Sequence, residues 1–395
     1  MDDFAQKLRG KLGKYESKYA HRPIAMILKV VGFSVLELLA ILFKSLKKTY
    51  PQKTTFDNVK FTVCFELLGG YGDIVVVANY IEKFAKKFGP NIEINITSDR
   101  QLTTCKDIFW GKSYIKGIIQ KKTECNFCAK IILTRYPIID YIDKRSKKLN
   151  PKLYDYLQFL FEFNKNNPES YDWAYPFDFV ATNRELLKGN TRTTMMDIGG
   201  RIGVKDSQFR LMYDENAKSI LNKYGLEKCS FATIQRGAQA SAEATKIMSL
   251  QKYNEFTSKF KRRFPDVKLV QLGRADTTKL ENIDVDLRGK TDANELKATL
   301  DAAKIHIDCE CGMVHLKNAL NKGRSVVFFG PTSPDFFAYE QNLNFRISSC
   351  KVPFCEWLDK DWTKKCIAGL EENRCINKID IDDVIRRIVE EKIFD

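Results

Sequence analysis

The sequence lacks the features of a secretory signal peptide. Met1 to Tyr19 is polar and charged, without the apolar core and small-residue cleavage site that such a signal needs. We therefore expect the chain to stay in the reducing cytoplasm. The eleven cysteines are an odd number, and in that compartment a cysteine cluster is more often a metal site than a set of disulfides.

Internal repeats, low-complexity tracts and the aromatic-basic motifs of known nucleic-acid-binding modules are also absent. Hydrophobic residues make up 44% of the chain and aromatic residues 12%, which excludes extended disorder. Acidic residues are fewer than basic ones, 50 against 65, so the formal net charge is +15. This charge suits nucleic acid, an anionic membrane surface or a phosphorylated small substrate, or it serves solubility alone. Without a recognisable module, we predict that nucleic acid is not a partner.

An apolar segment at 23–43 follows a basic, polar stretch at 1–22. Its length approaches that of a membrane span, but Lys29 and Glu37 interrupt it, and each is costly at a bilayer centre. Lysines are frequent in the residues that follow, at 44–53. An apolar helix that ends in lysines suits a peripheral anchor on the inner face of the cytoplasmic membrane. The alternatives are packing on a partner subunit or on the body of the protein, and true spanning.

The rest of the chain alternates between short β-branched or aromatic runs and longer helical patterns. The first series predicts strands at 61–67, 92–96 and 131–133, a helix at 74–88 and a mostly helical region at about 140–173. The second series predicts strands at 231–235, 267–272, 305–308 and 325–329 and helices at 250–263, 292–303, 313–321 and 380–392. Thr291 is the expected cap of the helix at 292–303.

Strands that alternate with helices predict parallel sheets with helices on both faces. At 395 residues the chain is too long for one ordinary core and about right for two domains. We therefore predict an α/β protein with a basic N-terminal segment at 1–54 and doubly wound domains at 55–220 and 221–395.

Two turns at the carboxyl ends of expected strands are candidates for ligand binding. The first, G-G-Y-G-D at 69–73, has glycines that allow close backbone approach, and the N-terminus of a helix follows it. It is not the dinucleotide fingerprint, because Asp73 and Ile74 stand where a later glycine is needed. Asp73 is either a general base or an ordinary carboxylate stabilised by the helix dipole.

The second turn, at 308–315, leads from a strand into a helix. Gly312 opens that helix, and its free amide groups can hold a diphosphate. His315 lies in the first helical turn, close enough to bond the same phosphate. A lone histidine in this place is otherwise a structural partner of a neighbouring backbone group.

Side-chain alternation assigns faces to the residues around this turn. Asp308 and Glu310 share one side of the strand, so we predict that both face the ligand. Cys309 and Cys311 fall on the opposite side and are interpreted as buried small side chains rather than metal ligands.

Three segments together resemble glycosyltransferase family 9, the bacterial heptosyltransferases. They are L-R-G-K-T at 287–291, C-G-M-V-H-L at 311–316 and V-V-F-F-G-P-T-S-P at 326–334. The family typically shows a strand ending D-(S/T)-G-x-x-H-L-A and then V-x-L-F-G-P-T-x-P. The early G-D at 72–73 also matches the family's N-terminal element. The resemblance covers most of residues 58–385, most strongly over 287–335.

The resemblance implies a GT-B architecture of two facing Rossmann-like domains. The N-terminal domain takes the acceptor, and the C-terminal domain takes a nucleotide-diphosphate sugar such as ADP-heptose. Transfer in this family inverts the anomeric centre and needs no catalytic metal.

The resemblance also implies roles for particular residues. Asp73 matches the family's catalytic aspartate, which favours the base over the capping carboxylate. Lys246 matches the lysine that faces the diphosphate, and Arg236 either adds a second cation or is a solvated surface residue. The loop at 237–245 is Ala-rich and lacks an obvious threonine pair for phosphate binding.

Gly312, Met313 and His315 match the start of the family's diphosphate-binding helix. Two departures lie beside them. The family's aspartate is Glu310 here, one methylene longer, and its serine or threonine is Cys311. Because that carboxylate normally touches the donor sugar, we expect either a different sugar or the same sugar held differently.

Four cysteines fall within a short, loop-rich stretch near the C-terminus. They are Cys350, Cys355, Cys366 and Cys375. Four thiolates so close can bind zinc or iron tetrahedrally, and a metal would stabilise a loop that has little core of its own. This set resembles the cysteines of the protein-modifying autotransporter heptosyltransferases, which carry bound iron. A structural metal is the favoured prediction, with free thiols and disulfides as alternatives.

The leading hypothesis is an inverting transferase that moves a sugar, such as a heptose, to a cell-envelope glycan of the lipopolysaccharide or lipooligosaccharide core. A glycolipid acceptor at the inner leaflet would suit the basic N-terminal segment. One alternative keeps the chemistry but makes the acceptor a protein. Another is an inactive family member that acts as an assembly scaffold.

Overall fold

The computed structural model describes residues 60–120, 127–167, 177–205, 209–237, 244–321, 323–347 and 375–395. It also describes residues 350, 355, 356, 358, 362–364, 366 and 369. The apolar segment at 23–43 and most of the loop at 237–245 lie outside these ranges. Contacts divide the chain into two compact units. The described parts of 60–69, 79–105 and 113–205 form the first unit, and those of 70–78, 106–112 and 206–395 form the second.

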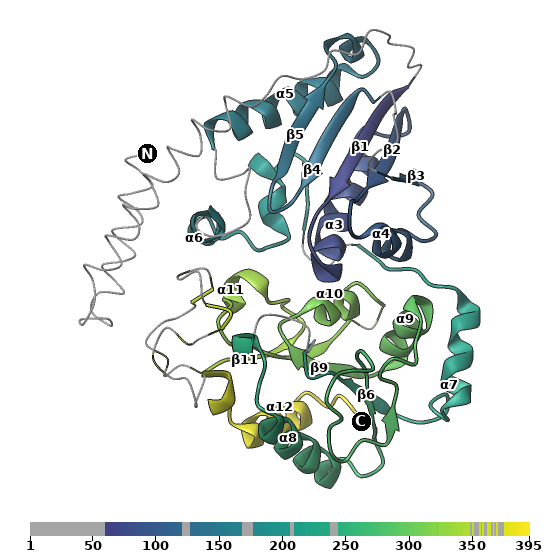
Figure 1. Cartoon of the computed structure of the whole chain (residues 1–395), viewed down its shortest axis with the longest axis vertical. Coiled ribbons are helices and arrows are strands. Elements are labelled where there is room, and N and C mark those ends of the chain that lie inside the picture. Colours follow the sequence, from purple (N-terminus) through teal and green to yellow (C-terminus); the bar gives the residue numbers. More distant parts are fainter. Residues whose placement is uncertain are drawn as a thin grey trace. The chain divides into compact units, whose positions relative to one another are not determined.

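The first unit contains a five-stranded sheet of order β3-β2-β1-β4-β5 (Figure 1). Its elements are β1 (Phe61–Leu67), α3 (Tyr71–Phe88), β2 (Ile92–Thr97), α4 (Leu102–Ile108), β3 (Ile115–Ile119), β4 (Ala129–Leu133), β5 (Pro137–Ile142), α5 (Pro151–Asn166) and α6 (Phe177–Leu187). The first four strands in spatial order are parallel, and β5 runs antiparallel to β4. The order 3-2-1-4-5 is that of a Rossmann-type sheet.

Hydrophobic patterning explains most of this unit. The strand predicted at 61–67 is confirmed as β1, and Phe65 packs edge-on against Phe84 of α3, with ring centroids 5.1 Å apart. The helix begins three residues earlier than the 74–88 prediction, at Tyr71. The helical prediction for 140–173 is wrong at its start, because β5 extends to Ile142. The β-branched residues of P-I-I-D-Y-I complete a hairpin with β4 there.

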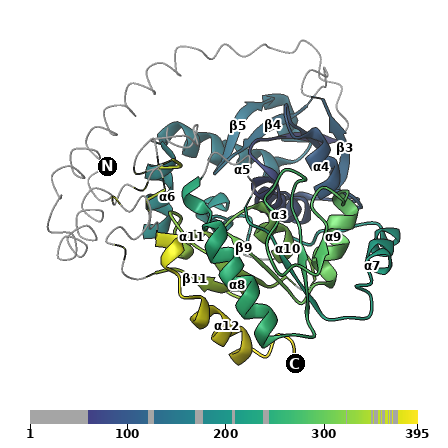
Figure 2. The same cartoon turned by 60° about the horizontal axis from the view of Figure 1, so that its bottom comes forward.

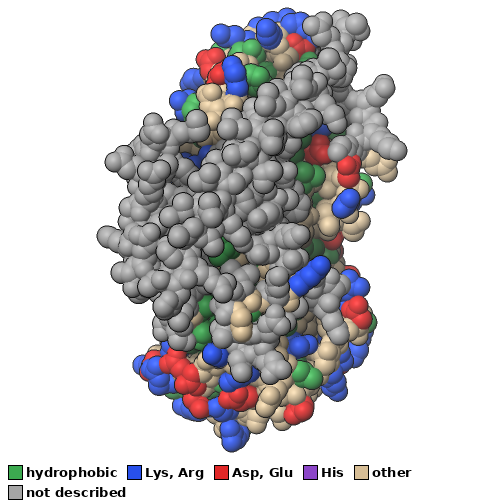
Figure 3. Space-filling view, turned by 60° about the vertical axis from the view of Figure 1, so that its left-hand side comes forward, with side chains coloured by type: hydrophobic (Ala, Val, Ile, Leu, Met, Phe, Trp, Pro, Cys, Tyr) green, Lys and Arg blue, Asp and Glu red, His purple; other side chains and the backbone are tan. Residues whose placement is uncertain are grey.

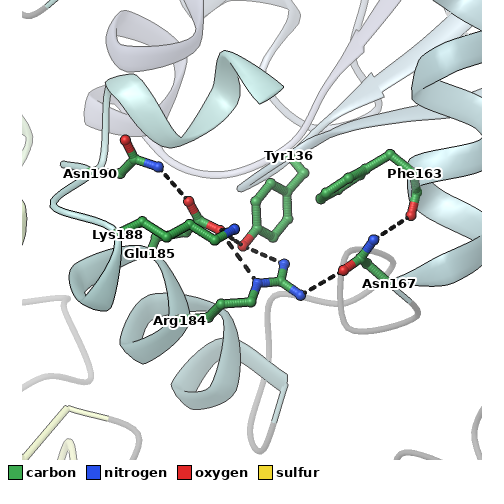
Figure 4. Close-up of polar contacts among 7 residues, drawn as sticks. All are labelled: Tyr136, Phe163, Asn167, Arg184, Glu185, Lys188 and Asn190. Carbon is green, nitrogen blue, oxygen red and sulfur yellow. Dashed lines mark hydrogen bonds and ion pairs between the residues drawn. The ribbon is translucent and has the colours of Figure 1, made fainter. Parts of the chain in front are cut away.

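A polar network ties α6 to the hairpin of β4 and β5 (Figure 4). Its centre is Glu185, a carboxylate only 3% exposed. Glu185 Oε1 accepts hydrogen bonds from the Tyr136 hydroxyl at 2.9 Å, Arg184 Nε at 3.3 Å and Lys188 Nζ at 2.9 Å. Asn190 Nδ2 donates to the other oxygen at 2.7 Å. Both oxygens of this buried carboxylate are therefore occupied by donors of the same unit.

The second unit contains a six-stranded parallel sheet of order β11-β10-β9-β6-β7-β8. Its strands are β6 (Phe231–Ile234), β7 (Lys268–Gln271), β8 (Val285–Asp286), β9 (Ile305–Cys309), β10 (Ser325–Phe328) and β11 (Leu343–Phe345). Its helices are α7 (Ser219–Lys223), α8 (Leu250–Arg263), α9 (Ala293–Ala302), α10 (Gly312–Asn318), α11 (Pro334–Phe337) and α12 (Ile381–Glu390). Counted from β6, this is the complete Rossmann order 3-2-1-4-5-6.

Helices cover both faces of the second sheet, as the alternation predicted (Figures 1 and 2). On β10, Val326 and Phe328 pack into the core shared with α8 and α12. Val327, between them, packs with Val314 of α10. Because successive side chains of a strand point to opposite faces, α10 lies on the face opposite α8 and α12.

Local capping sets the ends of the helices. Ser249 caps α8 by accepting a hydrogen bond from the Lys252 amide, and the helix spans the predicted 250–263. The cap predicted for α9 is wrong by one residue. Asp292, not Thr291, accepts a hydrogen bond from the Glu295 amide at 2.8 Å. The Glu295 carboxylate in turn accepts a hydrogen bond from the Asp292 amide, which completes a capping box.

One buried cation in the last turn of α10 ties this helix to α9. Lys317 has no exposed surface, and its Nζ donates to the carbonyl oxygens of Leu300 and Ala303 at 2.6 and 2.7 Å. These carbonyls belong to the C-terminal end of α9, where a positive charge is favoured by the helix dipole. The position of α10 is thereby tied to that of α9.

Candidate active site

The strand order of the second sheet defines where a ligand should bind. In doubly wound sheets the crevice lies at the carboxyl ends of the strands where the order reverses, here between β6 and β9. The chain continues from β6 into Arg236 and Gly237, and from β9 into Glu310 and α10. All of the donor-site residues predicted from the sequence lie at or near this edge, except that Lys246 is brought in by the segment before α8.

The centre of the site is a buried ion pair between Lys246 and Glu310. Lys246 Nζ lies 3.1 Å from Glu310 Oε2 and 3.8 Å from the carboxylate of Glu356. His315 Nε2 lies 3.7 Å from Glu310 Oε1, and His315 Nδ1 is hydrogen-bonded to the Tyr339 hydroxyl at 2.8 Å. The structure thus brings together three residues that are separated by up to 69 positions in the sequence (246 to 315).

The ion pair controls the ionisation of Glu310. Burial acts to raise the pKa of this carboxyl, but the positive charge of Lys246 and the contact with His315 outweigh burial and lower the pKa from 4.5 to about 2. Glu310 is therefore ionised at neutral pH. Beyond its 3.1 Å ion pair with Lys246, Glu310 Oε2 makes no hydrogen bond. This buried oxygen keeps capacity to accept a bond from a ligand hydroxyl.

Arg236 adds a second cation at the same edge. It is half-buried, and its Nε makes no hydrogen bond. Gly237, next along the chain, has a positive φ of 56°, and a Cβ there would lie 2.8 Å from Ile247 Cγ1. Glycine is therefore required for the turn that presents Arg236.

The prediction that Asp308 faces the ligand is wrong. Asp308 has no exposed surface, and its Oδ1 accepts bonds from the amides of Gly237 and Cys309 at 3.1 and 2.8 Å. The carboxylate joins the ends of β6 and β9 rather than lining the crevice. Alternation also fails beyond the strand, because β9 ends at Cys309 and Cys311 turns its thiol back to Asp308 Oδ2 at 2.9 Å.

The start of α10 is partly open. Gly312 and Met313 are half-buried, whereas the following Val314 and His315 are buried. The segment 70–78, which belongs to the same unit, comes close to it. A Cβ at Gly72 would lie 2.7 Å from Gly312 Cα, so a side chain is excluded at this point.

Asp73 lies in the first turn of α3. Its Oδ2 accepts a hydrogen bond from the Gly70 amide at 2.9 Å, which is the capping contact that one interpretation of the sequence expected.

Some side chains of the site carried no recognisable signal in the sequence. The indole of Trp362, 1% exposed, lies 5.5 Å from Lys246 Nζ. Thr245 Oγ1 donates to the Trp362 carbonyl at 2.9 Å. Trp362 and Glu356 come from more than 100 residues further along the chain, in a region without periodic patterning. Tyr339, whose hydroxyl is hydrogen-bonded to His315, likewise belongs to no recognisable sequence motif.

The four C-terminal cysteines lie near one another, and none of them forms a disulfide. Burial, followed by the neighbouring Cys366 and Cys350, raises the pKa of Cys355 to about 12. A hydrogen bond with Cys350, followed by burial, raises the pKa of Cys375 far above its usual value. The thiols are thus near enough to influence one another's pKa, although among the described residues no three of these sulfur atoms lie within 4.8 Å of one another.

Two observations concern the charge of the surface and the length of the helices. On the face drawn in Figure 3, the described Lys and Arg side chains are interspersed with Asp and Glu and do not gather into one basic patch. Within the ranges that the structure describes, no helix combines the length and apolar character needed to cross a bilayer.

The centre of the site lies within a segment that matches a known protein family. The sequence model of glycosyltransferase family 9 (heptosyltransferase) matches residues 238–356, a segment that contains Lys246, Glu310, Gly312 and His315. No curated protein matches the chain.

Solved structures match along most of the chain at low identity. The family 9 glycosyl transferase from Veillonella parvula is 14% identical, with a TM-score of 0.53, over 83% of this chain and 96% of its own. The dodecameric iron-containing glycosyltransferase TibC from enterotoxigenic E. coli is 13% identical, with a TM-score of 0.53, over 84% of this chain and 77% of its own. A complex of TibC with ADP-D-beta-D-heptose is 12% identical, with a TM-score of 0.52, over 87% and 82%.

Two Rossmann-type sheets, with a charged site at the switch point of the second, define an α/β protein of GT-B architecture. Residues 238–356 match glycosyltransferase family 9 (heptosyltransferase), so this segment of the second unit is of the glycosyltransferase class.

Proposed function

We propose that the chain transfers a sugar from a nucleotide-diphosphate donor to a hydroxyl of a cell-envelope glycan, with inversion at the anomeric carbon. The glycan is of the lipopolysaccharide or lipooligosaccharide core type, and the donor is ADP-heptose. The family match supports the sugar class, and the TibC complex with ADP-D-beta-D-heptose supports the donor.

The observation that carries this proposal is the Lys246–Glu310 pair at the switch point. Departure of a nucleoside diphosphate leaves negative charge on its oxygens, and a buried cation stabilises that charge strongly. Lys246 supplies this cation. Arg236 supplies a second one, and its Nε can donate to the diphosphate without breaking another hydrogen bond. The amides of Gly312 and Met313 at the start of α10, with His315 beneath them, complete the donor site.

Glu310 is proposed to hold the donor sugar. An ionised carboxylate accepts hydrogen bonds only, so it suits sugar hydroxyls, and its Oε2 has room for one. The longer side chain of glutamate, compared with the family's aspartate, sets how deeply the sugar can enter.

Asp73 is proposed as the general base. The acceptor oxygen attacks the anomeric carbon while the bond to the diphosphate breaks, and the acceptor's proton passes to the Asp73 carboxylate. One displacement of this kind inverts the anomeric centre, and no catalytic metal takes part. The acceptor is proposed to bind the first unit, where a cavity of about 420 Å³ lies beside Tyr136 and Lys188.

Two further features complete the proposal. A structural iron or zinc ion would bind Cys350, Cys355, Cys366 and Cys375, in keeping with the iron-containing TibC. The segment at 23–43, with its lysines, would hold the enzyme at the inner face of the cytoplasmic membrane, close to a glycolipid acceptor.

Thermal-shift measurements with ADP-, GDP- and UDP-linked sugars test the donor site, because a ligand that binds the folded state raises the apparent Tm. We expect a shift with ADP-heptose and a smaller one with the Lys246→Ala variant. No shift with any of the donors would contradict the donor site.

Transfer itself is tested with Asp73→Asn and Asp73→Ala. We expect both variants to keep the donor-induced shift and to lose transfer by a factor of about 10² to 10⁴. Unchanged transfer would remove Asp73 from the mechanism. NMR of the product reports the anomeric configuration, and retention would contradict the inverting mechanism. A panel of glycolipid and protein acceptors separates the cell-envelope glycan from a protein acceptor.

A further inference from the structure

The end of β9 carries a group of side chains that the proposed transfer does not use. Asp308, Cys309 and Cys311 each offer one ligand atom, and the three atoms lie within 4.8 Å of one another. Asp308 is fully buried, and Cys309 is 2% exposed. Two thiols and a carboxylate converge here, although the sequence placed the cysteines on the face opposite Asp308.

A buried histidine points into the same group. His306 has no exposed surface, and its Nε2 makes no hydrogen bond. That nitrogen lies 3.4 Å from Asp308 Oδ2, while Nδ1 is hydrogen-bonded to Thr233 Oγ1 at 3.0 Å. Nε2 and Asp308 Oδ2 therefore face each other in a dry interior without a hydrogen bond between them. A cation beside that oxygen would compensate the charge of the buried carboxylate.

The spacing fits a small metal ion. Thiolate sulfur lies about 2.3 Å and carboxylate oxygen about 2.0 Å from tetrahedral zinc, so the ligand atoms are roughly 3.5 to 3.8 Å apart. The pair Asp308 Oδ2 and Cys311 Sγ, now 2.9 Å apart around a shared proton, needs to open by less than about 1 Å. Two sulfur ligands favour zinc or ferrous iron over calcium or magnesium.

We propose that Asp308, Cys309 and Cys311 bind one divalent zinc or ferrous ion, with His306 facing the ligand oxygen. This site is additional to the four C-terminal cysteines. Binding forms two metal–sulfur bonds and one metal–oxygen bond, and the two thiol protons pass to solvent without any change of oxidation state. Because Glu310 lies between the two cysteine ligands, the ion would fix the backbone that carries it.

Cobalt(II) binding to the full chain tests the proposal. A Cys350→Ser/Cys375→Ser variant removes ligands from the C-terminal cluster and leaves the new site intact. After chelation, this variant is titrated with Co²⁺ alone, and the thiolate-to-cobalt charge-transfer absorption is followed. Because metal can enter a buried site slowly, the metal content of the same variant is also measured after expression with added zinc.

We expect one equivalent of metal with a charge-transfer band in the Cys350→Ser/Cys375→Ser variant. Adding Cys311→Ser, which supplies a hydroxyl of similar size, should weaken binding at least tenfold. Adding Cys229→Ser, a half-buried thiol outside both groups, should change nothing. The proposal is overturned if the parent variant binds no metal by either route, or if Cys311→Ser leaves its cobalt spectrum and stoichiometry unchanged. None of these readouts depends on sugar transfer.

Discussion

The two units each contain a buried glutamate surrounded by cations, and the two glutamates differ in one respect. Glu185 of the first unit accepts bonds at both oxygens, from Tyr136, Arg184, Lys188 and Asn190. Glu310 of the second unit is charge-compensated by Lys246, and beyond that ion pair its Oε2 makes no hydrogen bond. A carboxylate whose acceptor sites are filled by its own protein stabilises the fold, whereas one that is neutralised but under-bonded can still bind a ligand.

The largest effect is expected from Glu185→Ala. Removing this carboxylate leaves the buried Tyr136 hydroxyl without its acceptor. It also takes one of several acceptors from Arg184, whose side chain is 13% exposed and which keeps its bonds to Asn167 and Tyr136. We expect a loss of about 4 kcal/mol in the free energy of unfolding of the first unit. Denaturant unfolding measures the loss, and the donor-induced shift in Tm should remain. Lys188→Ala is the matched control, because that lysine is half exposed and should cost under about 1 kcal/mol.

Lys246→Ala is expected to act on catalysis. Loss of the cation facing the diphosphate should slow transfer by a factor of about 10² to 10³, equivalent to roughly 3 to 4 kcal/mol in the transition state. Steady-state kinetics with the donor identified by thermal shift measures the change. Lys252, which forms a 3.0 Å pair with Glu255 on α8, is the control, and Lys252→Ala should leave transfer unchanged. If Lys252→Ala slowed transfer as much as Lys246→Ala, the loss could not be assigned to the donor site.

The pH dependence of stability reports on Glu310 itself. Its pKa is lowered from 4.5 to about 2 on folding, so its contribution to stability is complete above pH 4.5 and is lost as the pH falls towards 2. We expect the wild type to exceed Glu310→Gln by about 3 kcal/mol at neutral pH, with the gap closing below pH 4.5. Urea unfolding at a series of pH values measures it. A gap that persists at pH 2 would indicate that packing, not charge, distinguishes the two proteins.

The smallest effect is expected from Asp292→Ala, which removes a carboxylate bound only within its own helix. Loss of the capping box of α9 should cost about 1 kcal/mol. Thermal unfolding measures the loss, and the donor-induced shift in Tm should be the same as in the wild type. A weakened donor response would mean that the position of α9 matters to the site.

Periodicity predicted the fold well because both sheets are built from local patterns. The 3.6-residue spacing of Tyr253, Phe256 and Phe260 defines α8, and β1 is a compact apolar run between polar neighbours. The antiparallel β5 was missed because a single short strand beside a helical region gives no sign of its direction. Asp292 could have been recognised as the cap from Glu295 three residues later.

The candidate site could be predicted only where its residues follow strands. Arg236 and Glu310 directly follow β6 and β9, so topology alone brings them to one edge. Glu356 and Trp362 reach Lys246 through tertiary packing, which leaves no pattern in the local sequence. The same holds for Glu185, whose partner Tyr136 is 49 residues away. The face of Asp308 was predicted wrongly because strand alternation says nothing of a carboxylate's bonds to a neighbouring strand.

Lys317, in the last turn of α10, gives this short helix a fixed position before any ligand binds. Its ammonium group is bound to carbonyl oxygens at the end of α9, so α10 takes its position when the second unit folds. A diphosphate that binds at Gly312 would therefore lose little affinity to ordering of the protein, and its charge would act on a helix that is already in place. Replacing Lys317 would then weaken donor binding, although Lys317 itself lies away from the atoms that the donor touches.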